Sequence, residues 1–87
     1  EDTAFSYAVL GRAYLESRNS LDAKEAFEQA IRQDHEQRYP EAYFWLAKSC
    51  YQVKQKGVYL RKFLSAVESK NEDIYKGMIE SARKQLR

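Results

Sequence analysis

Apolar side chains recur along this chain at the three- and four-residue steps of a helix, and no stretch alternates residue by residue as a β-strand does. Residues 4–17 are apolar around much of the helix circumference, which is typical of a helix packed on two sides. Between residue 20 and about residue 34 the apolar positions form a single stripe. The pattern therefore predicts an all-α protein that begins with a helical hairpin.

Three further helices are predicted by the same periodicity and by residues that start or stop helices. Pro40 has no amide hydrogen to lose in a first turn, so a third helix is expected over about 40–55. Gly57 is expected to end it with a positive φ, and a fourth helix follows over about 58–69. A fifth helix over about 72–85 is apolar on one side and charged on the other, as the end of a stack requires.

Residues that favour helix ends mark the same elements. Ser20 is expected to cap the second helix, with Asp22 and Glu25 in its positively polarised first turn. His35 is expected to end that helix as a favourable base, and Asn71 to cap the fifth helix. No Gly- or Ser-rich linker separates the elements, so we expect one cooperative unit.

The chain repeats itself after 36 residues. Tyr7, Leu10, Gly11, Tyr14, Ala23, Phe27 and Ala30 correspond to Tyr43, Leu46, Ala47, Cys50, Tyr59, Phe63 and Ala66. An internal repeat of this length is typical of stacked helical hairpins, because one hairpin cannot bury its apolar face alone. Such a stack has a concave surface lined by the first helices of successive hairpins.

These residues resemble the tetratricopeptide repeat, whose motif is aromatic-x2-Leu-Gly-x2-Tyr, then Ala-x3-Phe-x2-Ala and a closing proline. The first unit matches every slot except the proline, which is His35, whereas the second has Cys50 for tyrosine and Tyr59 for a small alanine. We therefore expect the second hairpin to be splayed or its second helix to be rotated, with the extra length of the repeat in a longer turn over 36–39. The resemblance implies an α-α superhelix, a right-handed solenoid of five antiparallel helices. Its single domain would comprise one repeat over about 4–37, a second over about 40–69 and a capping helix over about 72–86.

The resemblance implies a non-catalytic interaction module that holds a partner peptide or helix in its concave groove. The side chains expected to touch the partner are Phe5, Arg12, Glu16, Phe44, Lys48, Tyr51 and Gln52. Aromatic and arginine side chains dominate binding hot spots, and the two cations favour a segment whose apolar side chains are flanked by acids. For the three aromatic residues, ordinary packing between helices is the alternative. For Arg12 and Lys48, the alternative is a solvated charge at the rim.

The carboxylate clamp of chaperone adaptors in this family is not expected. Its slots hold Ala8, Arg12 and Trp45, so only one charge-assisted hydrogen bond to a carboxylate remains. The alternative function is structural: a segment that assembles copies of itself, as a homo-oligomer, or continues a longer solenoid.

Composition excludes several other classes. The 87 residues carry a net charge of +2, too balanced for a nucleic-acid-binding domain, although residues 1–41 hold nine acids and five bases and residues 42–87 hold four and ten. The single cysteine, Cys50, rules out an internal disulfide and is expected to be buried. The lone histidine has no nucleophile or ligand cluster beside it, so no cofactor, metal or enzymatic activity is expected.

The sequence contains few signals for a cellular compartment. No apolar run reaches the roughly 20 residues that span a bilayer, so a soluble piece is expected. The stretch 39–47, which begins with a Tyr-Pro step, resembles repeats of bacterial envelope-associated scaffolds. This second resemblance points to a bacterial protein and leaves cytoplasm and periplasm both open. A start at Glu1 without Met is interpreted as a fragment of a longer protein.

Overall fold

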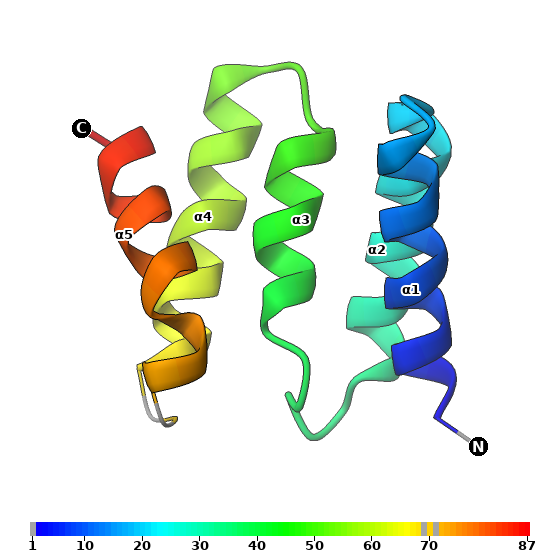
Figure 1. Ribbon diagram of the computed structural model, residues 1–87, viewed down its shortest axis with the longest axis horizontal. Helices are drawn as coiled ribbons and strands as arrows, with labels where there is room; N and C mark the ends of the chain where they lie inside the picture. The colour runs from blue at the N-terminus through cyan, green and yellow to red at the C-terminus, as the bar shows by residue number, and fades with distance from the viewer. Residues whose placement is uncertain (1, 69, 71) are drawn as a thin grey trace.

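The computed structural model describes residues 2–68, 70 and 72–87. Within them lie α1 (Thr3–Glu16), α2 (Ser20–Gln33), α3 (Glu41–Ser49), α4 (Val53–Val67), a 3₁₀ turn η1 (Glu72–Tyr75) and α5 (Lys76–Gln85) (Figure 1). No strand occurs among these residues. The predicted all-α class with five helices is confirmed.

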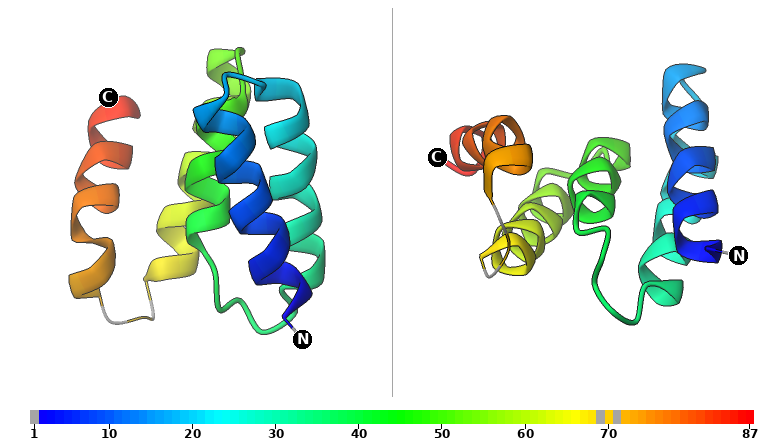
Figure 2. Two further views of the ribbon diagram at one scale, coloured as in Figure 1. Left: turned by 45° about the vertical axis from the view of Figure 1, so that its right-hand side comes forward. Right: turned by 60° about the horizontal axis from the view of Figure 1, so that its bottom comes forward.

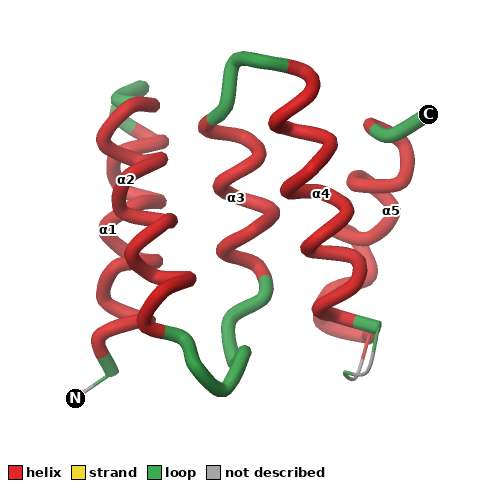
Figure 3. Tube along the Cα trace, turned by 180° about the vertical axis from the view of Figure 1, so that it is seen from behind, coloured by secondary structure: helices red, strands yellow, loops and turns green. Residues whose placement is uncertain are grey.

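The helices run alternately up and down and lie in two layers. In Figure 1, α1 lies in front of α2 and α5 in front of α4, and from behind α4 comes nearer than α5 (Figure 3). Turned so that the bottom comes forward, the same bundle shows α5 offset to one side of α4, while α1 overlaps α2 (Figure 2, right). The most extensive contacts join α1 to α2, then α3 to α4 and α2 to α3, so neighbouring hairpins pack in chain order.

A glycine sets the close approach of the first hairpin. A Cβ built on Gly11 would come 2.7 Å from the ring of Phe27, a distance that real Cβ contacts do not reach. Phe27 is fully buried and packs with Ala23 and with Leu46 of α3. The predicted close approach at Gly11 and the predicted reach of Phe27 into the next hairpin are confirmed.

Asn19, and not Ser20, caps α2. The Asn19 side-chain oxygen accepts the backbone N–H of Asp22 at 3.4 Å, while its amide donates to the Asp22 carboxylate at 2.7 Å. Arg18, with φ of 62°, turns the chain between α1 and α2. The predicted cap was one residue late because asparagine and serine, adjacent here, are equally good at this position.

Asp34 organises the turn between the two hairpins. Its carboxylate accepts the backbone N–H of Arg38 at 2.9 Å and of Tyr39 at 2.7 Å, while Gln37 adopts φ of 52°. This is the longer turn predicted over 36–39. His35 lies exposed in it, beyond the end of α2, so the prediction that it ends the helix is wrong.

The second hairpin turns earlier than predicted. Residues 50–52 leave the helical conformation after α3, with ψ of 139° at Cys50 and 127° at Gln52, and Gly57 lies inside α4 without a positive φ. A glycine inside a helix costs only about 1 kcal/mol relative to alanine. The buried stripe of α4, with Leu60 and Phe63, outweighs that cost and extends the helix through the glycine.

The core consists of two clusters joined at a seam. One comprises residues of α2 and α3 around Phe27; the other comprises residues of α3, α4 and α5 around Phe63. Trp45 and Tyr59 are half-buried and pack against both clusters. The large ring in the small-residue slot therefore fills the seam, and the α3–α4 contact is less extensive than the α1–α2 contact. The predicted helix end at residue 69 and the predicted cap Asn71 lie outside the described residues.

Candidate partner-binding surface

One face of α1 carries four exposed side chains at steps of four, three and four residues. These are Phe5, Val9, Arg12 and Glu16. Such spacing places them above one another along the helix. Phe5 is 52% exposed and its ring centroid lies 5.7 Å from that of Tyr39, at the entry to α3. The stripe is available to solvent over the length of α1.

Two cations from different helices converge on the single tryptophan. The guanidinium carbon of Arg12 lies 4.8 Å from the Trp45 ring centroid, and the Lys48 ammonium lies 5.3 Å from it. Arg12 and Lys48 are 36 residues apart, so the repeat delivers equivalent positions of α1 and α3 to the same ring. Both are exposed, and no carboxylate of the described residues lies within ion-pairing distance of either. We call Arg12, Trp45 and Lys48, with the α1 stripe, the indole face.

Phe44 lies beneath this face and not on it: its ring centroid is 5.4 Å from the Lys48 ammonium and 5.5 Å from that of Trp45, which it meets edge-on. Its burial corrects the expectation that it lines an open groove. Only 4% of its surface is exposed, and its centroid lies 5.4 Å from that of Phe63 in the core. Phe44 points toward the α4–α5 side of α3, where Tyr75 and Ile79 join the same cluster. The alternative of ordinary packing, left open for Phe44, is the one observed.

Tyr51 and Gln52 are exposed but do not extend the α3 face. Tyr51 is 84% exposed, and both residues lie in the turn because α3 ends at Ser49. That turn lies at the end of the bundle opposite to the start of α1 (Figure 1). The structure therefore brings Arg12 and Lys48 together, keeps Phe5 and Glu16 on the α1 stripe, and leaves Tyr51 and Gln52 apart from Phe5.

Trp45, which the sequence pattern alone did not assign to the site, belongs to it, and Lys84 continues the register of its two cations. Trp45 occupies the repeat position of Val9, and Lys84 occupies the position of Arg12 and Lys48 one repeat further on, exposed on α5. The signal was present in the sequence, because the 36-residue step, applied once more, reaches α5. Cations thus recur in register on α1, α3 and α5.

Asp2 links the start of α1 to the entry of α3. One carboxylate oxygen accepts the backbone N–H of Phe5 at 3.2 Å; the other accepts the Tyr39 hydroxyl and the Arg38 guanidinium, the latter at 2.9 Å. The hydrogen bond from Tyr39, helped by the one from Phe5, lowers the pKa of Asp2, and the same Tyr39–Asp2 hydrogen bond raises the pKa of Tyr39. These bonds fix the spacing between the two helices that supply the indole face.

An equivalent contact links α3 to η1. Tyr75, 36 residues after Tyr39, interacts with the Glu41 carboxylate at the start of α3. Burial raises the pKa of Glu41, and burial together with the Glu41 charge raises the pKa of Tyr75 to about 12. The entry to α3 is thus joined to the start of α1, and the entry to α5 is joined to the start of α3.

Other chemistry is sparse in the described part of the chain. Cys50 is buried, and burial raises the pKa of its thiol. No group of three His, Cys, Asp or Glu side chains there could hold a metal ion, and none of its helices is long and apolar enough to cross a membrane. In comparisons with known proteins, no family model, curated protein or solved structure matches this chain.

Proposed function

We propose that this chain is a non-catalytic interaction module of the tetratricopeptide-repeat type, which binds a partner segment on the face formed by α1, α3 and α5. The observation that carries the proposal is the convergence of Arg12 and Lys48 on Trp45. The two-layer order of the helices and the 36-residue register support a superhelical arrangement. In this proposal α5 is the cap, since it buries Ile79 and Ala82 and exposes charged side chains on its other side.

The partner chemistry follows from the groups on the indole face. Arginine can bind a carboxylate with two parallel hydrogen bonds, and lysine adds a second positive charge nearby. Cation–π contacts at exposed sites contribute about 0.5–1 kcal/mol each, so both cations can turn toward a carboxylate at small cost. Trp45 and Phe5 then offer apolar area. The segment that fits is extended or helical, with apolar side chains flanked by acids.

Selection of peptides from a random display library tests this function even though the natural partner is not identified. Peptides that bind the 87-residue protein should be rich in acids and large apolar side chains. Because Trp45 is the only tryptophan, its emission should shift when a tryptophan-free selected peptide binds. Arg12→Glu with Lys48→Glu should weaken the selected peptides at least about tenfold and reduce the salt dependence of binding.

A matched double variant controls for net charge. Arg32→Glu with Lys54→Glu removes one arginine and one lysine from exposed positions on α2 and α4, in the other layer. It should leave binding of the selected peptides within about twofold, and neither double variant should lower the melting temperature much, because exposed charges contribute little to stability. Equal losses in both double variants would contradict a specific indole face, as would selected peptides without acids.

Self-assembly is a second candidate because the charge of the chain is divided. The first 41 residues are acidic on balance and the remainder is basic, which favours contact between the first hairpin of one copy and the last helices of another. Contacts of this head-to-tail kind close into rings or extend into filaments. Light scattering across a concentration series distinguishes this candidate, since a monomer at high concentration excludes it.

A further inference from the structure

The outer side of the first hairpin is bare at positions that are buried on α3 and, at Ala82, on α5. Leu46 of α3 is 1% exposed against α2, whereas its counterpart Leu10 on α1 is 43% exposed. Ala82, the counterpart on α5, is fully buried in the cluster that includes α4. The same holds for the whole face: Ala42, Leu46, Ser49 and Cys50 are buried, and their counterparts Ser6, Leu10, Ala13 and Tyr14 are exposed or half-exposed.

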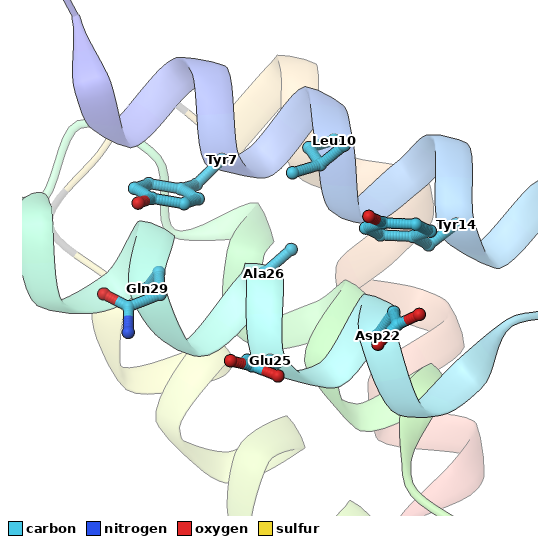
Figure 4. A pocket seen from close by; sticks show the side chains of 7 residues that line it. All are labelled: Tyr7, Leu10, Tyr14, Asp22, Glu25, Ala26 and Gln29. Carbon is cyan, nitrogen blue, oxygen red and sulfur yellow. The ribbon is translucent and has the colours of Figure 1, made fainter.

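A groove of about 340 Å³ lies along this bare side, between α1 and α2. Its α1 wall presents Tyr7, Leu10 and Tyr14 in a row, and Ala26 of α2 lies beneath Leu10 (Figure 4). Leu46, the α3 equivalent of Leu10, packs against Ala23 and Phe27 of α2, and Ile79 and Ala82 of α5 lie in the cluster that includes α4. The element that covers the equivalent positions on α3 and α5 is therefore a helix.

The charge of the groove is one-sided. The α1 wall contains no charged side chain, while the α2 wall presents Asp22 and Glu25, one helical turn apart (Figure 4). Asp22 accepts a hydrogen bond from the Asn19 amide, and Glu25 is exposed to solvent. No lysine or arginine of the described residues lines the groove. A helix that covers it meets an apolar strip beside a negatively charged edge.

We propose that this outer groove, a site distinct from the indole face, binds an amphipathic helix supplied by a partner protein. The apolar stripe of that helix packs along Tyr7, Leu10 and Tyr14, and lysine or arginine side chains beside the stripe pair with Asp22 and Glu25. Helix-in-groove recognition uses such apolar anchors at helical spacing. The proposal is independent of the function proposed for the indole face.

The chain itself provides a probe with this chemistry. In α4 the stripe of Leu60, Phe63 and Val67 is buried beneath α5, and basic side chains lie at Lys54 and Arg61 on its exposed surface. A fluorescent peptide of residues 53–67, with Gly57→Ala to raise its helicity, should bind the 87-residue protein in an anisotropy titration. A peptide of residues 20–33, which carries an apolar stripe with acids, is the matched control and should bind at least about tenfold more weakly, because its charges repel the groove acids.

Variants on the two surfaces locate the binding. Leu10→Arg, and separately Glu25→Lys, should each weaken the basic peptide by about tenfold or more, the scale of a lost hot-spot contact. Both positions are solvent-accessible, so circular dichroism should show the parent helix content, and the Glu25 variant serves where Leu10→Arg does not fold. Lys48→Glu on the indole face should not weaken the peptide.

Three results would overturn the proposal. The first is absence of peptide binding, or equal binding by the Leu10 and Glu25 variants and the parent. The second is equal affinity for the acidic control peptide, which would remove the charge requirement. The third is a dimer of the protein alone that Leu10→Arg dissociates, because a second copy, and not a partner helix, would then occupy the groove.

Discussion

α1 and α3 hold the same place in two successive repeats, yet one side of α3 is buried and the same side of α1 is bare. Their opposite sides agree more closely, since each carries a cation at the equivalent position, Arg12 or Lys48, and both cations lie over Trp45. Whether a position is buried therefore depends on the neighbouring hairpin, whereas the cations on α1 and α3 recur with the sequence repeat. This difference separates two candidate surfaces on one small chain.

The largest expected effect comes from truncating the two equivalent leucines. Leu46→Ala removes a fully packed side chain at the seam with α2 and should cost about 2–5 kcal/mol of unfolding free energy. Leu10→Ala removes a side chain that is already 43% exposed and should cost about 1 kcal/mol or less. Urea denaturation measures both. Similar losses in the two variants would mean that Leu10 is covered in solution, and that α1 and α3 do not differ in burial at this position.

A smaller effect is expected at the position where the two hairpins differ in their closest approach. Gly11 and Ala47 are equivalent, and a Cβ on Gly11 would press into the Phe27 ring. Gly11→Ala should therefore destabilise by about 1–3 kcal/mol through overpacking.

Gly77 provides the matched control for that substitution. It lies in α5 with nothing within 4 Å of its built Cβ, so Gly77→Ala should stabilise the protein by up to about 1 kcal/mol. Thermal unfolding of the two variants should thus shift in opposite directions. If Gly11→Ala also raised the melting temperature, the first hairpin would have room to adjust and would be no tighter than the second.

Sequence periodicity was sufficient for the helices and for the first hairpin. Five apolar stripes predicted five helices, and the motif slots of Gly11 and Phe27 predicted a contact that the structure contains. These features depend on interactions within a helix or between adjacent helices, for which spacing along the chain is enough.

The turn of the second hairpin and the composition of the candidate site could not be predicted in the same way. The turn moved because a glycine inside α4 costs less than the packing of its buried stripe gains. Phe44 is buried because Phe63 of α4 packs against it, with ring centroids 5.4 Å apart, in a cluster that residues of α5 complete. The convergence of Arg12 on Trp45 depends on the spacing between α1 and α3, which the turn at Asp34 and the bonds to Asp2 determine.

The smallest expected effect is on how stability depends on pH. Two carboxylates, Asp2 at the start of α1 and Glu41 at the start of α3, should change stability with pH in opposite directions. The pKa of Asp2 is lowered by the Tyr39 hydrogen bond, so its contribution to stability is present above its ordinary value near 3.8 and is lost as pH falls through the lower folded value. The pKa of Glu41 is raised by burial, so its contribution is present below its ordinary value near 4.5 and is lost as pH rises through the higher folded value. Asp2→Asn should therefore destabilise at neutral pH and lose that effect in acid, whereas Glu41→Gln should be better tolerated at neutral pH than in acid. Urea denaturation from about pH 3 to pH 7 measures both variants, and two profiles with the same slope would show that the exposed and the buried contact are electrostatically alike.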